Sequence, residues 1–214
     1  MIPFLKYKLS QFANPYPYRR YTRKYKCIFI HIPKTAGTSI LLKFVNKRIS
    51  RDHCSYFEYL MADMYRFKKY YKFCFVRNPY DRLVSVYHYF ARGGNGSPGD
   101  LYYSNIIKKE QMDFSSFVSI YINEYTIHEH LLLKPQYLFI YDHTGRLMVD
   151  YVGYFENLDT DFSTIAKKLG ISGALEKTNV SPRDSWVKYY TNITIADKVF
   201  LLYKKDFEIF KYHK

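Results

Sequence analysis

The sequence predicts an α/β fold: a P-loop-like, three-layer domain with a mainly parallel central sheet flanked by helices. Along the 214 residues, short apolar runs rich in β-branched and aromatic residues alternate with segments of helical spacing, an order typical of parallel sheets. Each of the first two runs leads directly into a turn and then a helix. Hydrophobic residues make up 48% of the chain, which is enough for a core that offsets the entropy of ordering.

The length leaves room for one domain, and we expect it at residues 27–214. Residues 1–26, rich in Tyr, Pro, Arg and Lys, are expected to form an irregular basic and aromatic arm. No run reaches the roughly 18–20 apolar residues of a membrane span. The three cysteines follow no metal-binding spacing, and two of them, Cys27 and Cys74, lie in apolar runs, so we expect buried free thiols in a reducing compartment.

The first half of the domain contains two units of the same kind. A strand is expected at 27–32, followed by a small-residue loop and a helix that continues to about residue 47. A helix at 56–69 then precedes a buried strand at 72–76. After this strand, Asn78 is expected to cap a further helix that has Pro79 at its first position.

The second half is less regular. Residues 93–99, rich in glycine, form a loop that can serve as a lid or only as a connection. A helix is expected at 113–123, and strands at 137–141 and 148–155 are joined around Gly145. The last expected elements are a helix at 159–169 closed by Gly170 and a long helix at 194–210 capped by its first residue, a threonine.

The positive net charge of the chain favours binding to an anionic ligand or surface. Lysine and arginine total 33 against 19 acidic residues, which gives a formal net charge of +14. Nucleic acid, an anionic membrane surface and a small phosphorylated or sulfated ligand all satisfy such a field, and net charge does not distinguish them.

The loop after the first strand has features of a phosphate site. A strand that ends in small residues and opens a helix directs several backbone N–H groups and the helix dipole toward one point. Lys34 adds a cation, Gly37 permits close approach of the backbone, and two hydroxyl residues follow it. The G-x-x-x-x-G-K-[ST] pattern of nucleotide triphosphatases is absent, which disfavours a magnesium-dependent NTPase. A tight turn with an incidental lysine explains this segment equally well when it is taken alone.

The turn after the second strand favours the phosphate interpretation. Arg77 follows a buried strand, so its guanidinium is expected to reach the edge of the sheet in a geometry suited to a phosphate. Ser85 lies about two helical turns further on and shares a helix stripe with Arg82 and Tyr89. Ligands of parallel sheets lie beyond the carboxyl ends of the strands, so we expect the two turns to hold two phosphate-like groups of one ligand.

These segments resemble the paired signatures of sulfotransferases that use 3′-phosphoadenosine 5′-phosphosulfate (PAPS), in the branch that sulfates carbohydrates. The first signature is HIPKTAGTS at 31–39 and the second is FVRNPYDRLVS at 75–85. The resemblance extends from about Cys27 to Tyr212. Its later parts are Pro135-Gln136, 152–158, 179–181 and 206–210.

The resemblance implies a role for each matching residue. The loop would hold the 5′ phosphosulfate, with Lys34 on the bridging oxygen. Arg77 and Ser85 would hold the 3′ phosphate, and Arg183 is a candidate for a further contact with the nucleotide. No metal is implied. The residues of the loop in this interpretation are Lys34, Thr35, Ala36, Gly37, Thr38 and Ser39.

The acceptor hydroxyl needs a base, because an alcohol attacks well only as its proton is removed. His53 is the first choice, since relatives in the carbohydrate branch place a histidine in this part of the chain, and an imidazole accepts a proton near neutral pH. His128 and His130 compete with it, although they lie further from Pro135-Gln136 than the histidine of relatives. His31 is expected to serve packing or loop support.

We therefore predict sulfuryl transfer from PAPS to a hydroxyl of a carbohydrate or glycolipid in polysaccharide biosynthesis, with release of adenosine 3′,5′-bisphosphate. One alternative is a nucleotide-dependent phosphoryl transferase, or kinase, which requires magnesium. The other is a non-enzymatic basic nucleic-acid-binding module. The predicted sulfuryl transfer involves no nucleic acid. We expect a cytoplasmic protein whose basic arm contacts the inner membrane surface.

Overall fold

The computed structural model describes residues 15–45, 52–173, 175 and 184–214. The chain divides into two compact units, which we describe separately. Unit 1 comprises Met1–Val76 and Leu138–Thr178, and unit 2 comprises Arg77–Tyr137 and Asn179–Lys214. The boundaries of this division lie within residues 27–214, the region predicted to be one domain.

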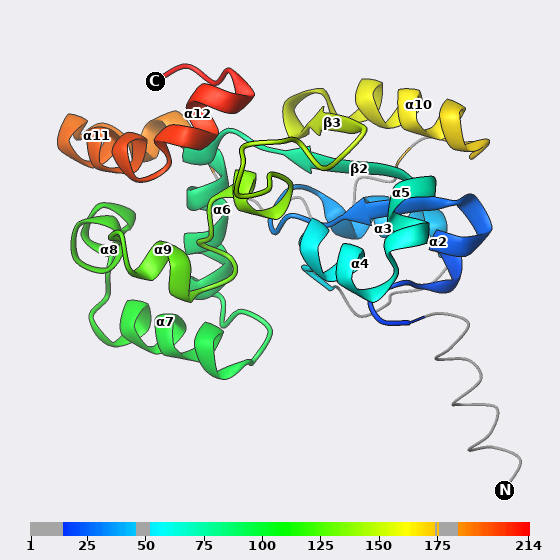
Figure 1. Cartoon of the computed structure of the whole chain (residues 1–214). Helices are drawn as coiled ribbons and strands as arrows, with labels where there is room; N and C mark the ends of the chain where they lie inside the picture. The colour runs from blue at the N-terminus through cyan, green and yellow to red at the C-terminus, as the bar shows by residue number, and fades with distance from the viewer. Residues whose placement is uncertain (1–14, 46–51, 174, 176–183) are drawn as a thin grey trace, which may run out of the picture. The chain divides into compact units, whose positions relative to one another are not determined.

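Unit 1 contains a three-stranded parallel sheet in the order β1-β2-β3 (Figure 1). The strands are β1 (Cys27–Ile30), β2 (Tyr71–Val76) and β3 (Tyr151–Tyr154). Ile30 of β1 lies beside Cys74 of β2. The first two strands therefore run toward the same edge of the sheet, and the predicted parallel α/β architecture is confirmed.

Helices flank this sheet. They are α2 (Arg20–Tyr25), α3 (Gly37–Phe44), α4 (Tyr56–Ala62), α5 (Met64–Lys69) and α10 (Leu158–Leu169), with a 3-10 turn, η2, at Phe155–Asn157. As predicted, Gly170 ends α10 in the left-handed conformation that glycine adopts most easily.

The core of unit 1 lies on both faces of the sheet. Phe29 and Phe73 on neighbouring strands stack with ring centroids 5.1 Å apart, and their face packs against side chains of α2, α3 and α10. The residues that point the other way, such as Ile28 and Cys74, are also fully buried. Continuous burial along β1 and β2 is expected of parallel strands covered on both faces.

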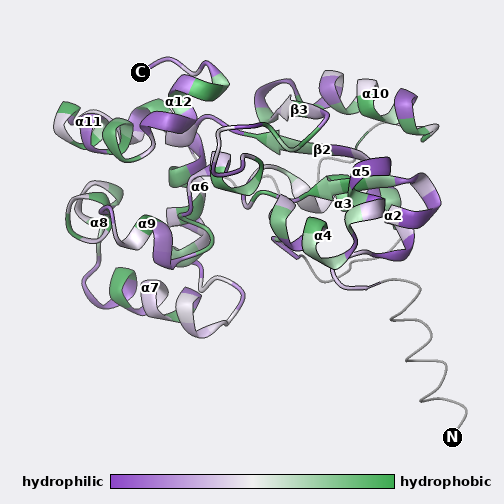
Figure 2. Ribbon diagram, viewed as in Figure 1, coloured by the Kyte–Doolittle hydropathy of each residue, from purple (hydrophilic) through white to green (hydrophobic). Residues whose placement is uncertain are grey.

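Unit 2 is helical. It contains α6 (Pro79–Ala91), α7 (Pro98–Lys109), α8 (Phe114–Tyr121), α9 (Thr126–Glu129), α11 (Ile193–Leu202), α12 (Lys204–Phe210) and η3 (Trp186–Tyr189). The 3-10 turn η1 (Gln136–Phe139) lies where the chain leaves this unit. As predicted, Asn78 caps α6 and Pro79 begins it. The apolar sides of these helices form one core cluster, and Figure 2 shows bands of hydrophobic colour along α8 and α11.

Three predicted elements are wrong in form. The helix expected at 56–69 is two helices, because Asp63 leaves α4 and its carboxylate caps α5. The strand expected at 137–141 is the turn η1, whose first amides bond to a side chain and not to a neighbouring strand. The terminal helix is α11 and α12, which meet at Tyr203, and its cap is Asn192 in place of Thr194.

Other differences concern extent. The arm expected to be irregular contains α2, and the helix α7 was not predicted. Loop 93–99 leads directly into α7, with Ser97 as its cap. The strand expected at 148–155 is reduced to β3.

Cys27, Cys54 and Cys74 are buried free thiols, as predicted for the two in strands. Among the described residues, no helix has the length and apolar character to span a membrane.

Candidate functional site

The loop between β1 and α3 has the backbone geometry of an anion site. Lys34 and Ala36 adopt the left-handed conformation, with φ of 69° and 65°. Such turns direct neighbouring N–H groups toward one side and form a concavity for anions. Ala36 occupies the cap position of α3 without a side-chain hydrogen bond, and the first turn has no acidic residue. The helix N-terminus therefore favours an anion, as the sequence predicts.

Gly37 is required by the side chain beneath it. A Cβ atom at this position would lie 1.8 Å from Nε2 of His31, which is far closer than nonbonded atoms approach. His31 follows β1 directly and is 4% exposed. Its imidazole is thus the floor of the loop, which agrees with the expected role in loop support.

The side chains of the loop differ in what they contact. Thr35 is fully buried and its hydroxyl donates to the carbonyl oxygen of Ile32 at 2.8 Å, so it closes the loop on itself. Ser39 is buried in the first turn of α3, whereas Lys34 and Thr38 are half-buried. Lys34 and Thr38 therefore retain surface that a ligand can contact.

His53 lies against the floor of the same loop. Its Nδ1 is 2.9 Å from the carbonyl oxygen of His31, and the two imidazole centroids are 4.3 Å apart. A ring nitrogen that faces a carbonyl oxygen carries the hydrogen, so the neutral ring has Nε2 as its proton acceptor. The structure thus brings the first-choice base and the predicted phosphate loop together within unit 1.

The competing histidines belong to unit 2. His128 is exposed on α9. His130 has Nε2 3.2 Å from a carboxylate oxygen of Asp100, and its Nδ1 accepts from the N–H of Leu132 at 3.2 Å. Burial lowers the pKa of His130, and Asp100 offsets part of this effect. Both ring nitrogens of His130 are therefore occupied, Nε2 by Asp100 at the start of α7 and Nδ1 by the backbone of Leu132.

Arg77 is the first residue of unit 2 and follows β2 directly. Its guanidinium contacts Oδ2 of Asp81 through Nε at 2.8 Å and Nη2 at 2.7 Å. Its backbone is held by Gln136, which accepts from the N–H of Arg77 at 2.9 Å and donates to its carbonyl at 2.8 Å. Both the side chain and the backbone of Arg77 are therefore fixed in position.

Asp206 in turn holds Gln136. Its carboxylate accepts from the backbone N–H groups of Gln136 at 2.8 Å and Tyr137 at 2.9 Å. It is fully buried, and burial raises its pKa. Both residues lie in the later motifs of the family resemblance, from which no role is predicted for them. Those motifs were the only signal, since the pairing joins residues 70 positions apart.

The structure places Ser85 and Arg82 on α6 but does not describe Arg183. Ser85 is buried on α6, and its ligand role stays a prediction. Arg82, on the same helix stripe, donates to the backbone carbonyls of Leu132 at 3.2 Å and Lys134 at 2.5 Å, so it serves the structure of unit 2. Arg183 lies outside the described residues. Within the part of the chain that the structure describes, no three His, Cys, Asp or Glu side chains group as a metal site requires.

A parallel sheet whose first strand opens into an anion-binding loop is typical of α/β proteins that bind phosphorylated ligands. The sequence model of the sulfotransferase family matches residues 19–213, and the chain belongs to this family. The match begins within the predicted arm and extends across both units.

Three relatives are similar to parts of the chain. Carbohydrate sulfotransferase 11 of Rattus norvegicus and that of Mus musculus are each 28% identical over 170 residues, which is 69% of this chain and 48% of the relative. The chain thus spans about half the length of these relatives. An uncharacterized protein of Archaeoglobus fulgidus is 32% identical over 124 residues, 57% of this chain and 87% of the relative. No solved structure shows a significant match.

Proposed function

We propose that the protein transfers the sulfuryl group of PAPS to a hydroxyl of a carbohydrate or glycolipid and releases adenosine 3′,5′-bisphosphate. The observation that carries this proposal is the contact of His53 with His31, the residue that supports the phosphate loop. Membership of the sulfotransferase family supports the reaction, and two relatives named carbohydrate sulfotransferases support the acceptor class.

The loop is suited to the phosphosulfate end of the donor. Its left-handed residues and the N-terminus of α3 supply N–H groups, and Gly37 lets the backbone approach closely. Lys34 is half-buried beside them and can neutralise the charge that grows on the bridging oxygen as the sulfur–oxygen bond breaks. Thr38 and Ser39 add hydroxyl groups at the same helix start.

His53 acts as the base. The acceptor oxygen forms a bond to sulfur while sulfur separates from the bridging oxygen, and the proton of the acceptor hydroxyl passes to Nε2 of His53. The hydrogen bond from Nδ1 to the carbonyl of His31 keeps the ring in the tautomer that can accept this proton. This pathway requires no metal.

Arg77 and Ser85 hold the 3′ phosphate of the same nucleotide, and Arg183 is a further candidate contact. The ion pair with Asp81 presents the guanidinium of Arg77 in one orientation before the ligand binds, which lowers the entropy cost of binding. Gln136 and Asp206 position the backbone of Arg77 for this purpose.

We further propose that the protein works in polysaccharide biosynthesis at the inner surface of the cytoplasmic membrane. Arg20, Arg23 and Lys24 are exposed on α2, and Figure 2 shows this helix in hydrophilic colours along its length. Basic side chains gathered on one surface helix are attracted to anionic lipid headgroups.

Calorimetric titration with adenosine 3′,5′-bisphosphate tests the donor site. We expect one site per chain, equal affinity with and without magnesium, and a loss of about 10- to 100-fold for Arg77→Ala, since a charge-assisted contact contributes about 1.5–3 kcal/mol. Arg146→Ala is the control, because Arg146 is exposed in a turn of unit 1. Magnesium-dependent selectivity for ATP would instead indicate a phosphoryl transferase. Salt-sensitive binding of nucleic acid that is indifferent to Arg77→Ala would indicate a nucleic-acid-binding module.

Turnover with labelled PAPS and a panel of glycans tests the base. His53→Ala is expected to lower kcat by about 10²- to 10⁴-fold, the usual contribution of a general base, while binding of the nucleotide stays unchanged. His128→Ala is the control because His128 is exposed in unit 2. A His53→Ala enzyme with normal kcat would contradict the assignment.

A further inference from the structure

The segment that carries His53 has no regular structure of its own. Residues 52–55 lie outside any helix or strand, and α4 begins only after the capping box formed by Ser55 and Glu58. Backbone hydrogen bonds of a helix or strand therefore do not fix the direction of the His53 side chain. Contacts of the side chains in this segment must do so.

Both neighbours of His53 are held by the N-terminal arm. Nε of Arg19 donates to Oδ2 of Asp52 at 2.8 Å, and Nη2 of Arg19 forms an ion pair with the same oxygen. On the other side, the hydroxyl of Tyr16 lies 3.3 Å from Sγ of Cys54. Two residues of the arm thus hold the chain immediately before and after the candidate base.

The arm is itself anchored to α4. Tyr18 is 3% exposed, and its hydroxyl contacts the carbonyl oxygens of Tyr59 and Asp63, each at 3.0 Å. Its ring also packs edge-on against Tyr59 at 5.3 Å. Tyr18 lies between Tyr16 and Arg19 in the sequence. Its contacts with α4 therefore hold these two residues close to the segment that carries His53.

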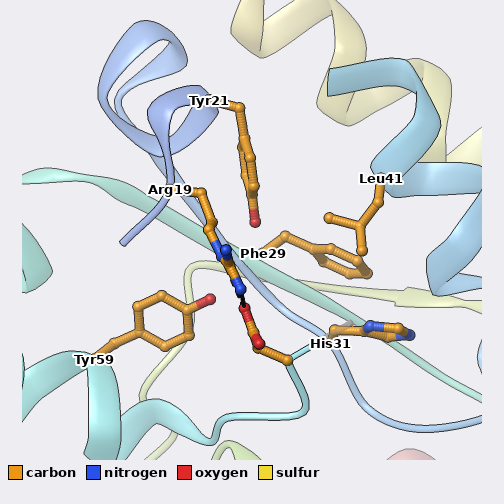
Figure 3. A pocket seen from close by; sticks show the side chains of 7 residues that line it. Arg19, Tyr21, Phe29, His31, Leu41 and Tyr59 are labelled. Carbon is orange, nitrogen blue, oxygen red and sulfur yellow. Dashed lines mark hydrogen bonds and ion pairs between the residues drawn. The ribbon is translucent and has the colours of Figure 1, made fainter. Parts of the chain in front are cut away.

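The ion pair of Arg19 and Asp52 lines a small cavity whose wall also includes His31 (Figure 3). The other lining residues are Tyr21, Phe29, Leu41 and Tyr59. Figure 3 shows Arg19 extending between the hydroxyl groups of Tyr21 and Tyr59. Aromatic and aliphatic walls lower the local dielectric constant and strengthen the attraction between the two charges. The carboxylate of Asp52 is 15% exposed and the side chain of Arg19 is 37% exposed, so the ion pair is shielded from water mainly on the side of Asp52.

From these contacts we propose that Arg19 and Asp52, assisted by Tyr16 and Cys54, form an arm clamp that positions the imidazole of His53 against His31, the floor of the loop between β1 and α3. The four residues are positioning residues. The inference rests on the proposed role of His53. An orienting contact of this kind affects catalysis because a displacement of about 1 Å at a reacting group can cost about 100-fold in rate.

Arg19→Ala, measured beside Lys68→Ala, tests the clamp in the full chain. Both variants remove one positive charge from unit 1, but Lys68 is exposed on α5. We expect Arg19→Ala to lower kcat by about 10- to 100-fold with unchanged affinity for adenosine 3′,5′-bisphosphate, and Lys68→Ala to match the wild type. Arg19→Lys should restore part of kcat, since a lysine keeps the ion pair but loses the second donor.

A second measurement does not depend on turnover. Nitrogen-15 correlation spectra of the histidine rings report which nitrogen of His53 is protonated. We expect one tautomer in the wild type and in Lys68→Ala, and a mixture in Arg19→Ala and Asp52→Asn. If Arg19→Ala does not fold, the milder Asp52→Asn variant still tests the clamp by the same spectra.

The outcomes separate the clamp from the proposed function. A wild-type protein that binds no adenosine bisphosphate and transfers no sulfuryl group refutes the function, while the ring spectra still decide the clamp. If the wild type is active and Arg19→Ala keeps both kcat and the single tautomer, the clamp is refuted and the function stands. An Arg19→Ala variant whose nucleotide affinity falls as much as its kcat also refutes the clamp, because Arg19 would then support the loop in general.

Discussion

The connection from β1 to α3 and the connection from β2 to α6 are held in one conformation by different means. After β1, the chain relies on backbone: two residues have positive φ, and Gly37 rests directly on the imidazole of His31. After β2, it relies on side chains: Gln136 holds both backbone groups of Arg77, and Asp206 holds Gln136. The first connection depends on the absence of a side chain, and the second on a chain of buried hydrogen bonds.

This difference affects which substitutions each connection tolerates. In the first, added atoms are harmful, because the space over His31 is already filled. In the second, removed atoms are harmful, because each deletion leaves buried donors without an acceptor. The comparison can therefore be tested by adding atoms to one connection and removing them from the other.

The largest effect is expected for Asp206→Ala. One buried and one partly buried N–H group lose their acceptor, at about 1–3 kcal/mol each, so the free energy of unfolding should fall by about 4 kcal/mol and the melting temperature by about 10 °C. Thermal unfolding followed by circular dichroism measures this. Asp184→Ala is the control, since Asp184 pairs with Lys188 on the surface and should have little effect. Equal melting temperatures for the two variants would show that the network does not stabilise the second connection.

A smaller effect is expected for Gly37→Ala. The new methyl group must displace His31 or the loop, at about 1–3 kcal/mol, and binding of adenosine 3′,5′-bisphosphate should weaken by about 10- to 100-fold. Calorimetric titration measures this. Adding His31→Ala should recover part of the affinity, because it removes the ring that the methyl group meets. If the double variant with Gly37→Ala and His31→Ala binds as weakly as Gly37→Ala alone, the proposed steric cause is wrong.

The smallest effect concerns the pH dependence of unit 2. Burial holds the pKa of His130 below its ordinary value of about 6.5, so the folded protein takes up this proton at lower pH than the unfolded chain. The corresponding stability is present above about pH 6.5 and is lost as the pH falls through the folded pKa. The melting temperature of His130→Gln should thus fall less than that of the wild type between about pH 7.5 and pH 5. An identical decrease would show that other groups cause the pH dependence.

Much of the fold could be predicted from local patterns. The strands at Cys27–Ile30 and Tyr71–Val76 are continuous apolar runs, and the cap at Asn78 and the stop at Gly170 follow from local backbone chemistry. Two of the errors have different causes, one a distant contact and one a local helix cap. The run beginning at Tyr137 has strand-like composition, but its N–H bonds to Asp206 and the chain turns. The helix expected at 56–69 breaks because the side chain of Asp63 bonds to the amide of Arg66.

The sequence alone indicated the chemistry of the candidate loop, since a lysine, a glycine and hydroxyl residues between a strand and a helix are typical of an anion site. Only the tertiary structure decided what His53 contacts, because its partner His31 lies 22 positions away, and Arg19, which holds the neighbouring Asp52, lies 33 positions from that residue. It likewise decided that Arg77 is held by Gln136. Hydrogen bonds between segments far apart in the chain depend on folding in three dimensions, and no local pattern encodes them.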